Sequence, residues 1–217
     1  MIDTGSGSEG GTGYGLLQEV RAYWEGLRQG GALPQRARID PRGLERALES
    51  VFLLERNAPD MARFRLAGMH LTVLMGMEVR GMPLSALFDE PGRHQLPAIL
   101  EHVFTGRSIA ELSLEGERGP GTPALEGRML LLPVLGDEGL CDRALGCLVT
   151  LGKVGRSPRR FAIASQHAET PRNGCRPTGP SSATRLVTGF AEPRQPFVPA
   201  PGERVRRPHL RLVKSDD

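Results

Sequence analysis

The residues of this sequence with the widest chemical range are its five histidines and three cysteines. Two of the cysteines, Cys141 and Cys147, lie six positions apart, but no further Cys or His stands at ligand spacing beside them. A zinc site takes about four such ligands, so we predict no metal site and interpret both side chains as structural thiols. Three cysteines cannot all pair with one another, which indicates a reducing, cytoplasmic setting.

The acidic residues and serines do not form a catalytic pattern. The pairs Asp89-Glu90 and Asp137-Glu138 stand at expected element ends and turns, whereas a general acid or base needs a pocket that shifts its pKa. No Gly-x-Ser-x-Gly elbow and no Gly-x-x-x-x-Gly-Lys phosphate loop occurs. Residues 5–10 spell a dinucleotide fingerprint, but no strand precedes them. We therefore predict that the protein is not an enzyme.

The charge of the chain divides at about residue 152. Residues 1–152 carry 15 basic and 20 acidic side chains, whereas residues 153–217 carry 13 and 5, together with half of the 18 prolines. Ordering a residue costs about 1–2 kcal/mol, which few apolar side chains between prolines can offset. We predict a disordered lead-in over 1–12, one domain over 13–152, and a disordered basic tail over 153–217. No apolar run approaches the roughly 18 residues of a membrane helix, so we predict no membrane insertion.

An amphipathic helix is predicted over residues 16–27, ending at Gly30-Gly31. Its apolar positions recur at intervals of three and four: Leu16, Leu17, Val20, Tyr23, Trp24 and Leu27. Two interpretations of this stripe stay open. It packs on its own domain, or it forms the seam of a homodimer through Leu16, Leu17, Val20, Trp24 and Leu27.

Strand-like segments and one long helix follow. Residues 96–104 show helical spacing and end at Gly106. Apolar runs or strict alternation predict five strands, at about 51–55, 63–66, 110–115, 127–135 and 144–151. Strands and helices that are segregated in this way predict an α+β domain, with an antiparallel five-stranded sheet and helices on one face.

Several short motifs occur within this expected order of elements. They are Tyr23-Trp24, Leu-Arg-Gln-Gly-Gly at 27–31, Pro-Gln-Arg at 34–36, Asp40-Pro41, Val-Phe-Leu-Leu at 51–54 and Phe-Arg-Leu-Ala-Gly at 64–68. Together they resemble a bacterial subgroup of compact, stand-alone PAS-domain proteins whose first helix carries Tyr-Trp. The resemblance covers roughly residues 14–152.

The resemblance implies a sensory or scaffolding module that holds a small ligand, or none, between the sheet and the long helix. Element position and periodicity select six candidate ligand-binding residues: Leu66, Leu74, Leu100, Val103, Leu112 and Leu131. In haem-binding PAS proteins the long helix supplies the axial histidine, which makes His102 the candidate cofactor-binding residue. The alternative is a partly exposed helix histidine, because His102 lies at the edge of the apolar stripe. The identity of any cofactor stays unknown.

The function that follows is a non-catalytic, PAS-type sensor or adaptor in bacterial signal transduction. No output domain is recognisable after residue 152, so the protein would act through contact with a partner protein. The alternative is a nucleic-acid-binding regulator that uses the basic tail. Its basic residues are Lys153, Arg156, Arg159 and Arg160, then Arg204, Arg206, Arg207, Arg211 and Lys214. Residues 208–213 alternate like a strand and could add to a sheet edge.

Overall fold

The computed structural model describes residues 14–171. The predicted lead-in over 1–12 and the end of the predicted tail, from residue 172 onward, lie outside the described residues. None of the helices within 14–171 is long and apolar enough to cross a membrane.

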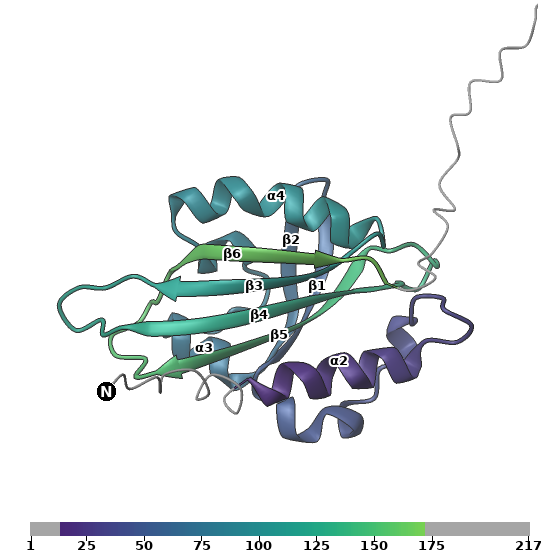
Figure 1. The fold of residues 1–217 in the computed structure, drawn as a ribbon, viewed down its shortest axis with the longest axis horizontal. Coiled ribbons are helices and arrows are strands. Elements are labelled where there is room, and N and C mark those ends of the chain that lie inside the picture. Colours follow the sequence, from purple (N-terminus) through teal and green to yellow (C-terminus); the bar gives the residue numbers. More distant parts are fainter. Residues whose placement is uncertain (1–13, 172–217) are drawn as a thin grey trace, which may run out of the picture. The chain divides into compact units, whose positions relative to one another are not determined.

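An antiparallel sheet forms the centre of the described domain (Figure 1). Its strand order is β2-β1-β5-β4-β3-β6, and every neighbouring pair is antiparallel. The strands are β1 (Val51–Ala58), β2 (Met61–Ala67), β3 (Ile109–Gly116), β4 (Leu125–Val134), β5 (Arg143–Gly152) and β6 (Phe161–Glu169). The predicted α+β class with an antiparallel sheet is therefore confirmed.

The sheet has six strands, however, not the five that the sequence predicted. The additional strand, β6, lies in the segment expected to be disordered and pairs with β3 from Ile109↔Glu169 to Gly116↔Phe161. It adds a ladder of backbone hydrogen bonds to the edge of β3, with one register shift between Ser113 and Leu114, and its Phe161 side chain is completely buried. A composition averaged over residues 153–217 hides this short strand.

The inner face of the sheet carries α3 (Met69–Met75), the 3-10 helix η3 (Leu84–Leu87) and α4 (Glu90–Phe104). The Asp89 side chain caps α4 by accepting a hydrogen bond from the Gly92 N–H at 2.9 Å. The predicted stripe of α4, which includes Leu96, Leu100 and Val103, is buried against the sheet. This confirms the long helix and the layer that it forms.

The outer face of the sheet carries α2 (Gly15–Leu27), η1 (Arg36–Arg38) and η2 (Pro41–Ala47). Leu17, Val20 and Trp24 of α2 are at most 3 % exposed. They pack on outward side chains of β4 and β5, and the Trp24 indole N–H donates to the Pro133 carbonyl oxygen at 2.9 Å. The helix therefore packs on its own domain, and these three side chains are not available as a homodimer seam.

Helices thus cover both faces of the sheet, not the one face that the sequence predicted, with α2 on the face opposite α3 and α4 (Figure 1). The apolar run 129–132 of β4 explains why both are needed. Met129 and Leu131 point into the inner core, whereas Leu130 and Leu132 point into the outer core. A strand that is buried on both faces shows such a continuous apolar run rather than alternation.

Candidate functional site

Five of the six predicted ligand-binding residues come together in the inner core. Leu74, Leu100, Val103, Leu112 and Leu131 are each at most 1 % exposed there. They come from α3, α4, β3 and β4, as the predicted order of elements requires.

The sixth residue, Leu66, lies on the opposite face and is 55 % exposed. Strict alternation would place it on the same face as Phe64, which is buried in the inner core. The pairing register shifts between Leu53↔Leu66 and Leu54↔Phe64, so β2 contains a one-residue irregularity at Arg65. One extra residue moves every later side chain of the strand to the other face, which turns Leu66 outward.

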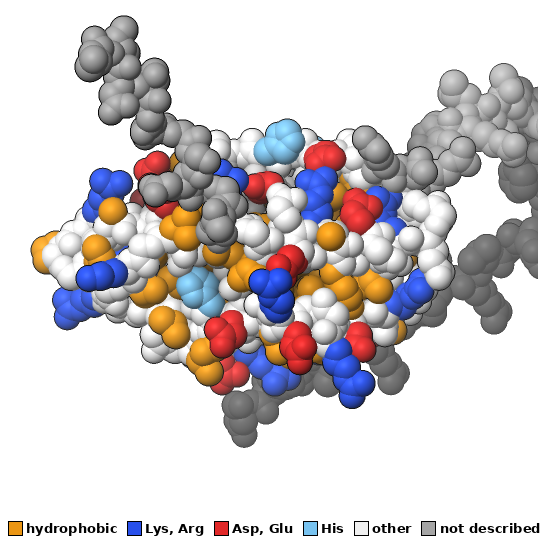
Figure 2. Space-filling view, turned by 60° about the horizontal axis from the view of Figure 1, so that its bottom comes forward, with side chains coloured by type: hydrophobic (Ala, Val, Ile, Leu, Met, Phe, Trp, Pro, Cys, Tyr) orange, Lys and Arg blue, Asp and Glu red, His pale blue; other side chains and the backbone are white. Residues whose placement is uncertain are grey.

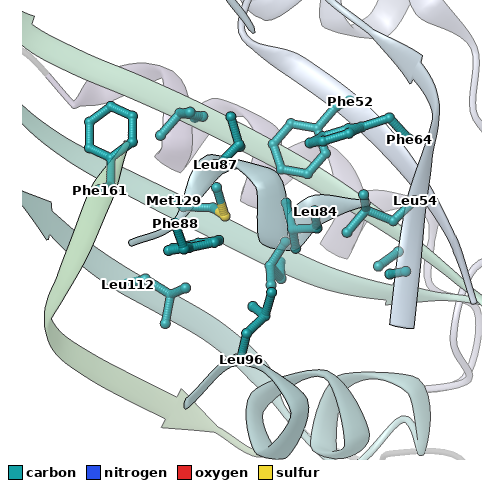
Figure 3. Close-up of a cluster of buried hydrophobic side chains, with 14 of the residues drawn as sticks. Phe52, Leu54, Phe64, Leu84, Leu87, Phe88, Leu96, Leu112, Met129 and Phe161 are labelled. Carbon is teal, nitrogen blue, oxygen red and sulfur yellow. The ribbon is translucent and has the colours of Figure 1, made fainter. Parts of the chain in front are cut away.

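Large side chains fill the space between the sheet and α4 (Figure 3). Phe52 and Phe64 meet edge to face, with ring centroids 5.3 Å apart, and Phe88 and Phe161 are fully buried in the same core. A haem or flavin at the five predicted residues would have to displace these side chains. The residues present in this core therefore do not fit a large planar cofactor.

His102 does not face this core. Its side chain is exposed, its Nδ1 lies 2.8 Å from the Ala98 carbonyl oxygen, and it lines a groove on the surface between α4 and β6. His94, at the start of α4, is also exposed.

Cys147 and Cys141 lie in or against the outer core. Cys147 is buried in the outer core, and this burial raises the pKa of its thiol to about 12, so the thiol stays protonated at neutral pH. The Cys141 thiol lies 3.6 Å from the Val103 carbonyl oxygen. Among residues 14–171 we find no cluster of three His, Cys, Asp or Glu side chains that could hold a metal. Cys175 lies outside the described residues.

An open apolar groove lies on the outer face, between the two 3-10 helices and the β1–β2 hairpin. We call it the outer groove; its volume is about 730 Å³. Three of its lining side chains are strongly exposed: Leu48 (48 %), Leu66 (55 %) and Met69 (64 %). Figure 2 brings the α2 side of the molecule forward and shows hydrophobic side chains reaching the surface between charges of both signs.

Arginines gather at one end of the outer groove. A smaller cavity of about 170 Å³ shares Arg36, Leu53 and Leu66 with the groove and is also lined by Arg65, Arg80, Asp137 and Arg143. Arg65 and Arg143 are both paired with Glu55, at 3.0 and 2.8 Å. The side chains of Arg36 and Arg80 form no hydrogen bond or ion pair with any residue in the described range. The sequence did not predict this cluster, because its four arginines come from separate segments.

A second groove, which we call the α4–β6 groove, has a volume of about 510 Å³ and lies on the other side of the sheet. It contains two residues that the sequence predicted for a site, His102 and Leu112. Its lining mixes apolar and polar residues, and it includes the side chain of Ser108, which is buried without a hydrogen-bond partner in the described structure.

The chain matches the family model of the PAS domain over residues 16–149. A comparison with curated proteins found no match. Among solved structures, the LOV protein of Rhodobacter sphaeroides is 16 % identical, with a TM-score of 0.38 over 64 % of this chain and 68 % of that one. The LOV domain of the blue-light photoreceptor Aureochrome1 is 15 % identical, with a TM-score of 0.38 over 51 % and 80 %.

An RNA-binding light-oxygen-voltage receptor is 22 % identical, with a TM-score of 0.36, and the match covers 54 % of this chain but 35 % of that receptor. The family assignment rests on the PAS model, which spans more than half of the chain. The chain belongs to the PAS-domain family.

Proposed function

We propose that this PAS protein is a non-catalytic sensor or adaptor of bacterial signal transduction that acts by contact with a partner protein. The observation that carries the proposal is the outer groove, where Leu48, Leu66 and Met69 expose apolar surface in one place. Single exposed apolar residues are ordinary on a protein surface, whereas a contiguous apolar groove is typical of an interaction site. The buried Cys147 thiol, which forms no disulfide, supports a reducing cytoplasm as the location.

The chemistry of the outer groove selects the kind of partner. The apolar floor suits leucine-like side chains, and Arg36 and Arg80 at its end offer guanidinium groups without an internal partner. Guanidinium groups bind carboxylates in a bidentate geometry, so the partner segment would carry acidic residues beside its apolar ones. We propose an acidic, amphipathic segment of another protein as the occupant.

Side chains rather than strand addition would hold this segment. The free edge of β2 is partly occupied, because the Phe64 N–H donates to the Met82 carbonyl at 3.0 Å and the Gly81 N–H donates to the Phe64 carbonyl at 2.7 Å. A helix laid into the outer groove, with apolar anchors on one face, is the recognition mode that fits such an arrangement.

No observation favours the nucleic-acid alternative. Of the basic residues directly after β5, Arg159 is 1 % exposed and donates to three backbone carbonyls, so it is not a surface charge. The basic cluster over 204–214 lies outside the described residues, and its role stays a prediction.

A photo-crosslinking amino acid in place of Met69, in the full chain within cells that express it, tests the proposal. Met77 is the matched control, because it is also an exposed methionine (54 %) but lines none of the three cavities. We expect a protein adduct at position 69 that is absent at position 77 and is lost in Arg80→Glu. Adducts that are the same at both positions, that are nucleic acid, or that persist in Arg80→Glu would contradict the proposal.

A further inference from the structure

The α4–β6 groove exists because β6 extends the sheet beneath α4. Figure 1 shows α4 running above β6, and the groove between them is lined from both elements and from β3. Ile99, Ala110 and Leu112 give it an apolar floor. Its volume of about 510 Å³ lies within the range of small-molecule sites, roughly 300–1,000 Å³.

Ser108 is the feature of this groove that points to a ligand. The residue is 7 % exposed, and its hydroxyl has no hydrogen-bond partner among the described residues. Buried hydroxyl groups in folded proteins nearly always have a partner, because leaving one unpaired costs free energy. Since Ser108 lines the groove, a molecule bound there would supply the missing hydrogen bond.

The polar side chains around Ser108 carry no negative charge. Gln95 and His102 come from α4, Arg107 precedes Ser108, and Gln166 lies opposite Leu112 on the inner face of β6. No Asp or Glu of the described range lines the groove. His167 also lies in the groove wall, but it stands opposite Glu111 on the ladder, so strand alternation turns its side chain to the other face.

Neighbouring carboxylates do not neutralise the groove. Glu101 pairs with Arg56, Glu169 pairs with Arg21, and Glu111 lies 3.6 Å from Arg128. The Arg107 side chain is exposed and makes no ion pair with the described residues. The groove therefore suits a ligand that carries an anionic group.

The hydrogen bonds available to the His102 ring suit such a ligand. A carbonyl oxygen can only accept, so the contact of Nδ1 with the Ala98 carbonyl requires the proton on Nδ1. In the neutral ring, Nε2 is then an acceptor, and in the protonated ring it is a second donor. His102 can thus match either a hydroxyl or a carboxylate on the ligand.

We propose that the α4–β6 groove binds a small organic acid. Arg107 and the Ser108 hydroxyl hold its carboxylate, and its apolar body lies on Ile99, Ala110 and Leu112. Binding would join α4 to β6 through a ligand that contacts both elements. The proposal does not depend on the outer groove, which lies on the opposite face of the sheet.

Titration of the ¹⁵N-labelled full chain with phenylpropionate, and with phenylpropionamide as the uncharged control, tests this site by NMR. We expect the acid to shift the amide signals around Ser108 and Gln166 and to bind at least about tenfold more tightly than the amide. Arg107→Gln and Ser108→Ala should each reduce the affinity of the protein for phenylpropionate by roughly tenfold. Leu66→Asp, in the outer groove, should leave its affinity unchanged.

Thermal unfolding separates loss of the site from loss of the fold. Ser108→Ala removes an unpaired hydroxyl, so the variant without ligand should melt no lower than the parent protein, while the shift caused by the acid is lost. Equal binding of acid and amide, no shift near Ser108, or binding that is lost in Leu66→Asp but kept in Arg107→Gln would overturn the proposal.

Discussion

The two faces of the sheet are covered to different degrees. On the inner face, α3, η3 and α4 close over side chains such as Phe52, Phe88 and Phe161, which are at most 1 % exposed. On the outer face, α2 covers β4 and β5, but the part over β1 and β2 stays open as the outer groove. The inner face is therefore closed over its core, whereas the outer face leaves an open groove over β1 and β2.

The elements above each face explain this difference. A 15-residue helix lies over the inner face, whereas the β1–β2 part of the outer face has only two 3-10 helices, of three and seven residues. The side chains of such short helices cannot cover a sheet in the way that α4 does. Leu53 and Leu66 pair across β1 and β2 and both line the outer groove, where Leu66 stays 55 % exposed.

Replacing Trp24 by Ala should give the largest effect, because it removes the anchor of the covered part of the outer face. The indole is fully buried and bonded to Pro133. Truncation of a buried Trp costs about 3–5 kcal/mol in the free energy of unfolding. Urea unfolding followed by circular dichroism measures this change.

Leu66→Ala is the matched control on the open part of the same face, and we expect it to change the free energy of unfolding by less than about 0.5 kcal/mol. Trp24 is the only tryptophan, so its fluorescence in the parent protein reports on α2 alone. If that signal changed at lower urea than the circular dichroism, α2 would be a detachable element and the comparison of the two faces would fail.

Arg159→Met should have the next largest effect. The guanidinium group donates to the carbonyls of Glu117 (3.0 Å), Pro123 (2.8 Å) and Val154, which closes the end of the inner core. Methionine has a similar length but no donors, so these three carbonyls would lose their partner, and the free energy of unfolding would fall by about 2–4 kcal/mol.

Arg160→Met is the control, because the neighbouring side chain is exposed, and it should be nearly neutral in the same urea experiment. An equal loss in the free energy of unfolding for the two variants would mean that residues 153–160 do not stabilise the inner core. Arg159 would then act as an ordinary surface charge.

Local patterns were enough to predict much of the inner core. Helical spacing identified α4, and apolar runs identified β4 and β5, because burial of a whole face imposes a regular period on the sequence. Five of the six predicted ligand residues share the inner core for the same reason. The stripe of α2 was equally clear, but periodicity alone could not tell whether its own sheet or a second chain covers it.

The two grooves depend on features that the spacing of apolar residues along the sequence does not show. A one-residue irregularity in β2 turned Leu66 outward, and β6 lay hidden in a basic, proline-rich segment. Without β6 there is no α4–β6 groove, so the setting of Ser108 could not be anticipated. The arginine cluster likewise forms only when Arg36 and Arg80 meet in the fold.

The smallest effect concerns a polar contact at the rim of the inner face. His70 of α3 lies with its Nε2 3.1 Å from the Thr150 hydroxyl of β5. Burial lowers the pKa of His70 from its ordinary value of 6.5, and the Glu49 carboxylate opposes this only in part. The unfolded chain therefore binds a proton at His70 more readily than the folded protein does.

The protein should consequently lose stability as the pH falls below the unfolded pKa of His70, and this loss ends below the folded pKa. His70→Gln keeps a group that can bond to Thr150 but does not titrate. We expect the difference in free energy of unfolding between parent and variant to favour the parent less at about pH 5.5 than at about pH 7.5, on either side of the ordinary histidine pKa. A difference that stays constant between these values would mean that His70 is solvated like a surface side chain, and that the inner face is open at this rim.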